Sequence, residues 1–172
     1  MLFRSKDIVD VEVNVNHIFE WSEDPTFHRQ KILNEMLMES KTEVVVNYDC
    51  DVILPIESYL AAYKGILDKT YDVIYPYGQG NFQKQVVADD SVVSKFLETK
   101  DYSILDDSSN EHTSDFGWVQ FFNRQVYLDG FMENENFVAY APEDKERFYR
   151  FRSEEHMSEL QSHSFISYAV FC

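Results

Sequence analysis

The sequence predicts an α/β fold in which helices flank a mainly parallel sheet. Apolar, strand-like segments alternate along the chain with segments of helical periodicity, which is the order typical of such sheets. The chain has 172 residues, the size of one domain, and its 44% hydrophobic and 16% aromatic content argues against disorder. No apolar run approaches the roughly 20 residues that a membrane-spanning helix needs.

The first half of the chain alternates between the two kinds of element. Residues 8–15 (IVDVEVNV) alternate apolar and polar side chains, the period of a half-buried strand. Pro25 suits the first turn of a helix, and apolar residues recur at helical spacing over 26–38. Residues 43–48 (EVVVNY) predict a buried strand, and 56–67 (IESYLAAYKGIL) predict a helix.

The second half continues the same alternation. Two further strands are expected over 71–77 (YDVIYPY) and 118–122 (WVQFF). Helix-like spacing predicts three more helices, over 88–100, 123–130 and 143–150. The polar stretch 101–115 predicts a loop, the best candidate for a mobile segment.

Charge and cysteine content narrow the classes of function. Lys+Arg number 15 against 31 Asp+Glu, a net charge of −16. This balance argues against binding to nucleic acid or anionic lipid, so a bound anion needs local donors or a metal ion. Cys50 has no partner within residues 1–151, so we expect neither a disulfide framework nor a cysteine-based zinc site. The unpaired thiol favours a cytoplasmic site of action, at a membrane surface or free of one.

The last stretch, residues 152–172, resembles the conceptual translation of a common sequencing adapter. Its segments RSEEH, SELQS and ISYAVFC match that translation in order. An ordinary amphipathic C-terminus is the alternative. We therefore expect residues 1–151 to be the native part, a partial catalytic domain, and 152–172 to be a non-native tail, which we leave out of the fold prediction.

Asp49 and Asp51 follow an apolar strand directly. Strand side chains alternate with a period of two, so we expect both carboxylates to point to the same side. Ligands of α/β sheets bind at the carboxyl ends of strands, and paired carboxylates there suit a hard cation such as Mg²⁺ or Mn²⁺. Such an ion would bridge to a phosphorylated substrate. The alternative is a solvated turn with two chance carboxylates.

Adjacent acids, Glu143 and Asp144, begin the last predicted helix, shortly after Tyr140. A carboxylate base could face a substrate hydroxyl there, with an aromatic platform beside it. Alternatively, the two acids only complement the helix dipole.

The helix over 26–38 carries Arg29, Lys31 and Asn34. The two basic side chains could reach a phosphate or a base, and the amide could hydrogen-bond a nucleotide. Alternatively, all three are ordinary surface residues of a helix.

Taken together and in order, these groups resemble the motifs of metal-dependent glycosyltransferases of the GT-A fold. The likeness is closest to the β-1,4-galactosyltransferase-like group and related bacterial family 2 enzymes. It spans residues 8–151 and rests on collinear motifs: the FxRxKxLN spacing of Phe27, Arg29, Lys31, Leu33 and Asn34; DCDVILP over 49–55; Phe116-Gly117-x-Val119; Gly130-Phe131; and Tyr140-Ala141-Pro142-Glu143-Asp144.

The resemblance implies a reaction and a role for each motif. The enzyme would move a sugar, with inversion, from a nucleotide-sugar donor (a UDP-sugar) to a hydroxyl of a glycan acceptor, as in polysaccharide biosynthesis. The implied roles are metal binding (Mn²⁺ or Mg²⁺) by Asp51 with Asp49, nucleotide or donor binding by Arg29, Asn34, Asp49 and Gly117, acceptor binding by Tyr140 and Glu143, and base catalysis by Asp144.

The sequence also departs from the family pattern. Trp118 stands where the family has the second glycine of FGGV, and Tyr140 stands where it has tryptophan. The family's opening strand has no counterpart before Met1, and its downstream metal-binding histidine would lie beyond Phe151. We therefore expect a GT-A domain that is incomplete at both ends, and this piece of it can be inactive.

Two other functions remain open. A haloacid-dehalogenase-like phosphotransferase also places a DxD motif after an apolar strand, with Asp49 as its nucleophile, but it leaves FxRxKxLN and residues 140–144 unexplained. A non-catalytic carbohydrate-binding relative would keep the fold and lack the chemistry.

Overall fold

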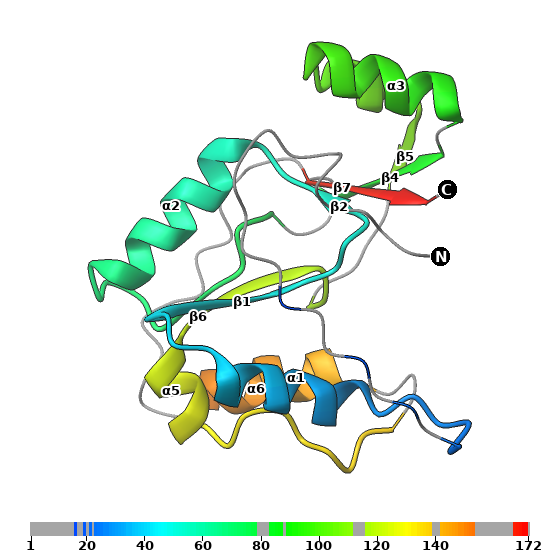
Figure 1. Cartoon of the computed structure of the whole chain (residues 1–172). Helices are drawn as coiled ribbons and strands as arrows, with labels where there is room; N and C mark the ends of the chain where they lie inside the picture. Colours follow the sequence, from blue (N-terminus) through cyan, green and yellow to red (C-terminus); the bar gives the residue numbers. More distant parts are fainter. Residues whose placement is uncertain are drawn as a thin grey trace.

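The computed structural model describes residues 16, 19, 21, 23–78, 83–87, 89–111, 116–138, 142–153 and 167–171. Within these residues the chain is mixed α/β, so the broad class predicted from the sequence is confirmed (Figure 1). None of the described helices is long and apolar enough to cross a membrane. The predicted strand over 8–15 lies outside the described residues.

The helices follow the periodicity of the sequence closely. They are α1 (Arg29–Glu39), α2 (Ile56–Leu67), α3 (Asp90–Thr99), α4 (Ser103–Asp107), α5 (Arg124–Asp129) and α6 (Glu143–Ser153). Five of them start within three residues of the predicted helices; α4 is the exception, because residues 101–115 were expected to form a loop. That stretch contains both α4 and a short strand.

The strands are β1 (Val44–Tyr48), β2 (Val52–Ile53), β3 (Val73–Ile74), β4 (Gln83–Val87), β5 (Ser109–Glu111), β6 (Val119–Asn123) and β7 (Ser167–Phe171). β1 and β6 were expected. The strand predicted over 71–77 shrinks to the two residues of β3, and Pro76 lacks the N–H that a longer ladder would need. β2, β4 and β5 were not predicted.

Two small sheets are formed. β1, β6 and β3 make a three-stranded sheet in the order β1-β6-β3, antiparallel throughout, with Val46 opposite Phe121. The second sheet has the order β2-β7-β4-β5, and only its β4–β7 pair is parallel. The described strands therefore do not form the mainly parallel sheet that the sequence led us to expect. β7 falls within residues 152–172, whose adapter origin stays a prediction.

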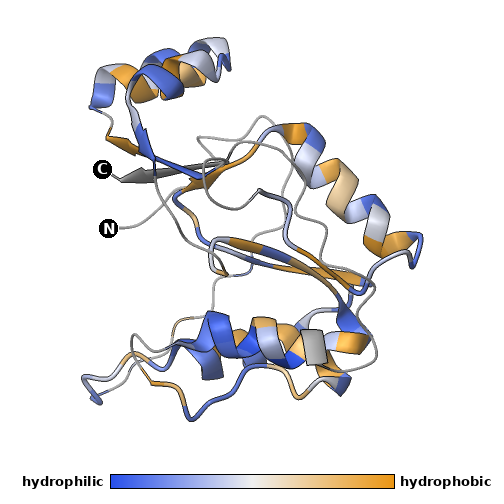
Figure 2. Ribbon diagram, turned by 180° about the vertical axis from the view of Figure 1, so that it is seen from behind, coloured by the Kyte–Doolittle hydropathy of each residue, from blue (hydrophilic) through white to orange (hydrophobic). Residues whose placement is uncertain are grey.

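Helices cover both faces of the three-stranded sheet (Figure 1). Neighbouring β6 residues alternate between these faces, as a strand requires. Phe121 contacts Tyr59 of α2 on one face, and Phe122 contacts Tyr127 of α5 and Phe151 of α6 on the other. Figure 2 shows the apolar residues concentrated in the central strands, while α1 and α6 carry many hydrophilic residues. These helices therefore bring charged groups close to the core.

Candidate functional site

The candidate residues gather where β1 ends. The strand stops at Tyr48, and residues 49–52 form a turn closed by a hydrogen bond from Val52 N to Asp49 O (3.1 Å). Asp49 N donates to Trp118 O (2.8 Å), which ties this turn to the start of β6. The expectation that strand alternation aligns Asp49 with Asp51 is therefore wrong, because neither residue belongs to the strand. Asp51 is exposed, whereas Asp49 is half-buried.

Arg29, the first residue of α1, joins two of the predicted motifs. Its Nη2 lies 2.9 Å from Asp49 Oδ1, and its Nη1 lies 3.3 Å from Glu143 Oε1 at the start of α6. The Glu143 side chain is 8% exposed, so this contact is partly shielded from water. Three segments that are far apart in the sequence therefore meet at one guanidinium group.

The carboxyl group of Asp49 has a raised pKa. Burial is the largest cause, and the negative charges of Asp144 and Asp51 add to it, while Arg29 acts in the opposite direction. The charges of Asp144 and Asp51 are therefore close enough to act on Asp49, although burial is the main cause of its raised pKa. A cation placed among them would be favoured.

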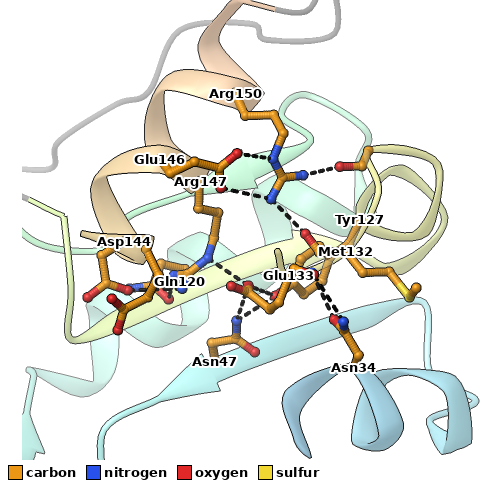
Figure 3. Close-up of polar contacts among 12 residues, drawn as sticks. Asn34, Asn47, Gln120, Tyr127, Met132, Glu133, Asp144, Glu146, Arg147 and Arg150 are labelled. Carbon is orange, nitrogen blue, oxygen red and sulfur yellow. Dashed lines mark hydrogen bonds and ion pairs between the residues drawn. The ribbon is translucent and has the colours of Figure 1, made fainter. Parts of the chain in front are cut away.

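Asp144, in the first turn of α6, lies beside Arg147 and Gln120 (Figure 3). Its Oδ1 accepts a hydrogen bond from Arg147 Nη2 (2.9 Å), one turn further along α6. The Arg147 side chain is only 1% exposed, and its Nη1 donates to Gln120 Oε1 (2.9 Å) on β6. The Asp144 carboxylate is thus held in a fixed orientation, while its own side chain keeps 31% exposure.

The charge of Arg147 is balanced inside the protein. Arg147 Nε lies 2.7 Å from Glu133 Oε1, and both side chains are 1% exposed. Tyr127 OH donates to the same Glu133 oxygen, and Asn47 Nδ2 lies 3.3 Å from it (Figure 3). The nearby carboxylate of Glu133 raises the pKa of Arg147 against the opposing effect of burial, so the side chain stays charged.

The side chain of Asn34 hydrogen-bonds to the segment that contains Glu133. Glu133 N donates to Asn34 Oδ1 (2.7 Å), and Asn34 Nδ2 donates to Glu133 O (3.0 Å) and to Glu135 Oε1 (2.8 Å). Its side chain is buried. The structure therefore gives Asn34 a role in holding the loop after α5, and it does not bring this amide to Asp49.

The segment before β6 has an unusual backbone. Gly117 is buried, and its carbonyl accepts a hydrogen bond from Tyr77 OH. The next residue, Trp118, has φ of 73°, a left-handed conformation that a side chain disfavours. Its carbonyl binds Asp49 N, so this strained segment directly supports the 49–52 turn.

Not every predicted residue can be placed. Tyr140, the predicted acceptor platform, lies outside the described residues. Among the residues that are described, no group of three or more His, Cys, Asp or Glu side chains is arranged to hold a metal ion by itself.

Sequence reasoning missed the buried residues that support this site, namely Arg147, Glu133 and Gln120. The spacing of Asp144 and Arg147 places both on one helix face, which was an available signal for their ion pair. No such signal exists for Glu133, which lies in a loop. Its neighbours Phe131 and Met132 have φ of 67° and 57°.

Comparison with known proteins adds no identification. No protein-family model matches the chain, and no curated protein matches it significantly. The geometry of the residues themselves therefore carries the functional argument.

Proposed function

We propose that the chain is part of a metal-dependent, inverting glycosyltransferase of the GT-A fold, acting on a nucleotide-sugar donor and a glycan acceptor. One observation carries the proposal. Arg29, Asp49 and Glu143, which belong to three separate motifs of the resemblance, meet in one ion-pair cluster. Asp144 lies close enough to raise the pKa of Asp49. Chance surface residues would have no reason to converge in this way.

The donor set at the 49–52 turn fits a divalent cation. Asp49 and Asp51 offer hard oxygen ligands, and the pKa of Asp49 is raised mainly by burial, with a smaller contribution from the charges of Asp144 and Asp51. Mg²⁺ and similar ions typically take one or two protein carboxylates and complete their shell with water and substrate phosphates. An incomplete set of protein ligands is therefore what a diphosphate-bridged ion needs. When bound, Mn²⁺ or Mg²⁺ would neutralise charge on the departing nucleoside diphosphate.

Asp144 is the proposed base. Its Oδ1 is held by Arg147, which leaves Oδ2 for the proton of an acceptor hydroxyl. As that proton moves to the carboxylate, the hydroxyl oxygen attacks the anomeric carbon from the side opposite the phosphate. The bond from the anomeric carbon to the phosphate oxygen breaks, and the sugar configuration inverts. Glu143 would bind the acceptor, and the fixed orientation of both carboxylates supplies part of the catalysis.

The backbone at Trp118 gives independent support. The resemblance places a glycine at this position, and φ of 73° is the conformation that glycine adopts without strain. Trp118 thus keeps a glycine-like backbone although its side chain differs. The backbone conformation at this position could not be read from the sequence motif, because the residue there is tryptophan.

The proposal is tested by measuring UDP binding to the full chain by calorimetry, with and without Mn²⁺. We expect Mn²⁺ to strengthen binding, and Asp51→Ala to weaken the Mn²⁺-dependent binding by about tenfold, or ~1.4 kcal/mol. Asp107→Ala, an exposed aspartate on α4, is the matched control and should leave binding unchanged. Asp144→Asn should leave UDP binding intact but lower any transfer rate by about 10²-fold or more.

Two results would overturn the proposal. The first is UDP binding that is absent or indifferent to Mn²⁺. The second is release of phosphate from an aryl phosphate that Asp49→Asn abolishes, because that result identifies Asp49 as a phosphotransferase nucleophile. Binding of UDP with normal transfer by Asp144→Asn would refute only the assigned base.

A further inference from the structure

Tyrosine hydroxyls surround the turn that carries Asp49 and Asp51. Tyr48, the last residue of β1, donates from its hydroxyl to Val52 O at the far end of the turn. Its oxygen lies 2.8 Å from the hydroxyl of Tyr59 on α2. Leu54 N in turn donates to Tyr59 OH (3.1 Å). Two side chains from different elements therefore connect both ends of the segment 52–54.

The direction of these hydrogen bonds follows from counting protons. A tyrosine hydroxyl has one proton to donate and can accept further bonds. Val52 O can only accept, so the proton of Tyr48 is committed to it. Tyr59 must then donate to Tyr48. The order is fixed: Leu54 N–H to Tyr59, Tyr59 to Tyr48, and Tyr48 to the Val52 carbonyl.

A third tyrosine anchors the same segment from the other side. Tyr102, just before α4, donates to Leu54 O (3.0 Å). The two central rings also pack, since the centroids of Tyr48 and Tyr59 are 6.0 Å apart and Tyr59 lies 6.5 Å from Phe121 in the core. The hydroxyl chain is therefore attached to the hydrophobic core and not only to the exposed turn.

We propose that Tyr48 and Tyr59 are positioning residues, whose ordered hydroxyl chain fixes the 49–52 turn and thereby the two carboxylates on it. The assignment rests on the proposed function in so far as those carboxylates bind a metal ion. Neither tyrosine contacts substrate in this role.

The variants Tyr48→Phe and Tyr59→Phe keep the rings and remove one hydroxyl each. Tyr63→Phe is the matched control: Tyr63 lies one turn further along α2, and no hydrogen bond involves its hydroxyl within the described structure. Ile66→Val, in the core of the same helix, controls for a general loss of stability without touching the turn.

The first readout is amide hydrogen exchange of Val52, whose N–H binds Asp49 O and not a tyrosine. A lost hydrogen bond of ordinary strength corresponds to about fivefold faster exchange through local opening. We expect this acceleration in Tyr48→Phe and Tyr59→Phe. Tyr63→Phe and Ile66→Val should leave the exchange of Val52, relative to an amide in β6, unchanged.

The second readout is the Kd for Mn²⁺ in the presence of UDP, which should rise about fivefold in the two tyrosine variants and not in the two controls. Unchanged Val52 exchange, or faster exchange with an unchanged Kd, would overturn the assignment. If the wild-type chain shows no Mn²⁺-dependent UDP binding, the proposed function fails, and the metal-positioning role fails with it. The exchange rate of Val52 then still decides whether the two hydroxyls hold the turn.

Discussion

The buried ion pair between Arg147 and Glu133 makes the sharpest stability prediction. Replacing Arg147 with Met keeps most of the side-chain volume but removes the charge and three polar contacts. Glu133 would then keep its carboxylate in the interior with only the neutral partners Tyr127 and Asn47. Breaking one side of a fully buried pair typically costs about 3–5 kcal/mol, because the remaining charge is desolvated and unpaired.

The assay is thermal unfolding at pH 7, monitored by circular dichroism. For a domain of this size, a loss of about 3–5 kcal/mol corresponds to a fall in Tm of roughly 6–20 °C. The double variant Arg147→Met with Glu133→Leu should recover much of that loss, since an apolar pair of similar volume often replaces a buried ion pair at little cost.

Lys31→Met on α1 is the control, because its ion pair with Glu35 joins two side chains that are 49% and 42% exposed. Exposed pairs of this kind contribute at most about 1 kcal/mol. If Arg147→Met lowers the free energy of unfolding no more than Lys31→Met does, the buried ion pair between Arg147 and Glu133 does not stabilise the protein as argued. The same conclusion follows if the double variant is as unstable as Arg147→Met alone.

Three further predictions concern single positions. The folded pKa of Asp49 is raised above its ordinary value of 3.8, so its contribution to stability is full below that value and is lost as the pH rises through the folded pKa. In urea titrations over this pH range, wild type should therefore lose stability relative to Asp49→Asn. A difference in stability that stays constant with pH would contradict this. Gly130→Ala should cost about 1–3 kcal/mol, since its Cβ would lie 2.5 Å from Phe151 Cε1, and an unchanged midpoint would refute the clash. Asn123→Ala should cost about 1 kcal/mol by removing the side-chain cap of α5, which thermal unfolding can measure against the neighbouring Gln125→Ala.

Local patterns in the sequence were enough to predict most helices. The segment 56–67 forms α2 with the predicted bounds, because Pro55 sets its start and its apolar spacing matches the helix period. Strand pairing could not be predicted in the same way. β1 pairs with β6, a partner far along the chain, and the antiparallel direction of that pair depends on contacts that no local pattern encodes.

The candidate site was predicted in part. The order of the motifs led us to expect Arg29, Asp49 and the acids of α6 at one site, and in the structure Arg29 forms ion pairs with Asp49 and Glu143. The geometry of the DxD motif was mistaken, because strand periodicity was extended past Tyr48 into a turn. Turns depend on partners such as the Trp118 carbonyl, and these are invisible until the fold is formed.

The distribution of the arginines explains which carboxylates remain for a cation. Arg29 forms ion pairs with Asp49 and Glu143, and Arg147 forms ion pairs with Asp144 and Glu133. Asp51, exposed at the same end of the sheet, has no ion pair among the described residues. In a chain with 31 acids and 15 basic side chains, not every carboxylate can be paired. Here an unpaired carboxylate lies two residues from Asp49, and its charge contributes to the raised pKa of Asp49, of which burial is the largest cause. A divalent cation is therefore expected to depend more on Asp51 than on Glu143 or Asp144, although all three lie at the same site.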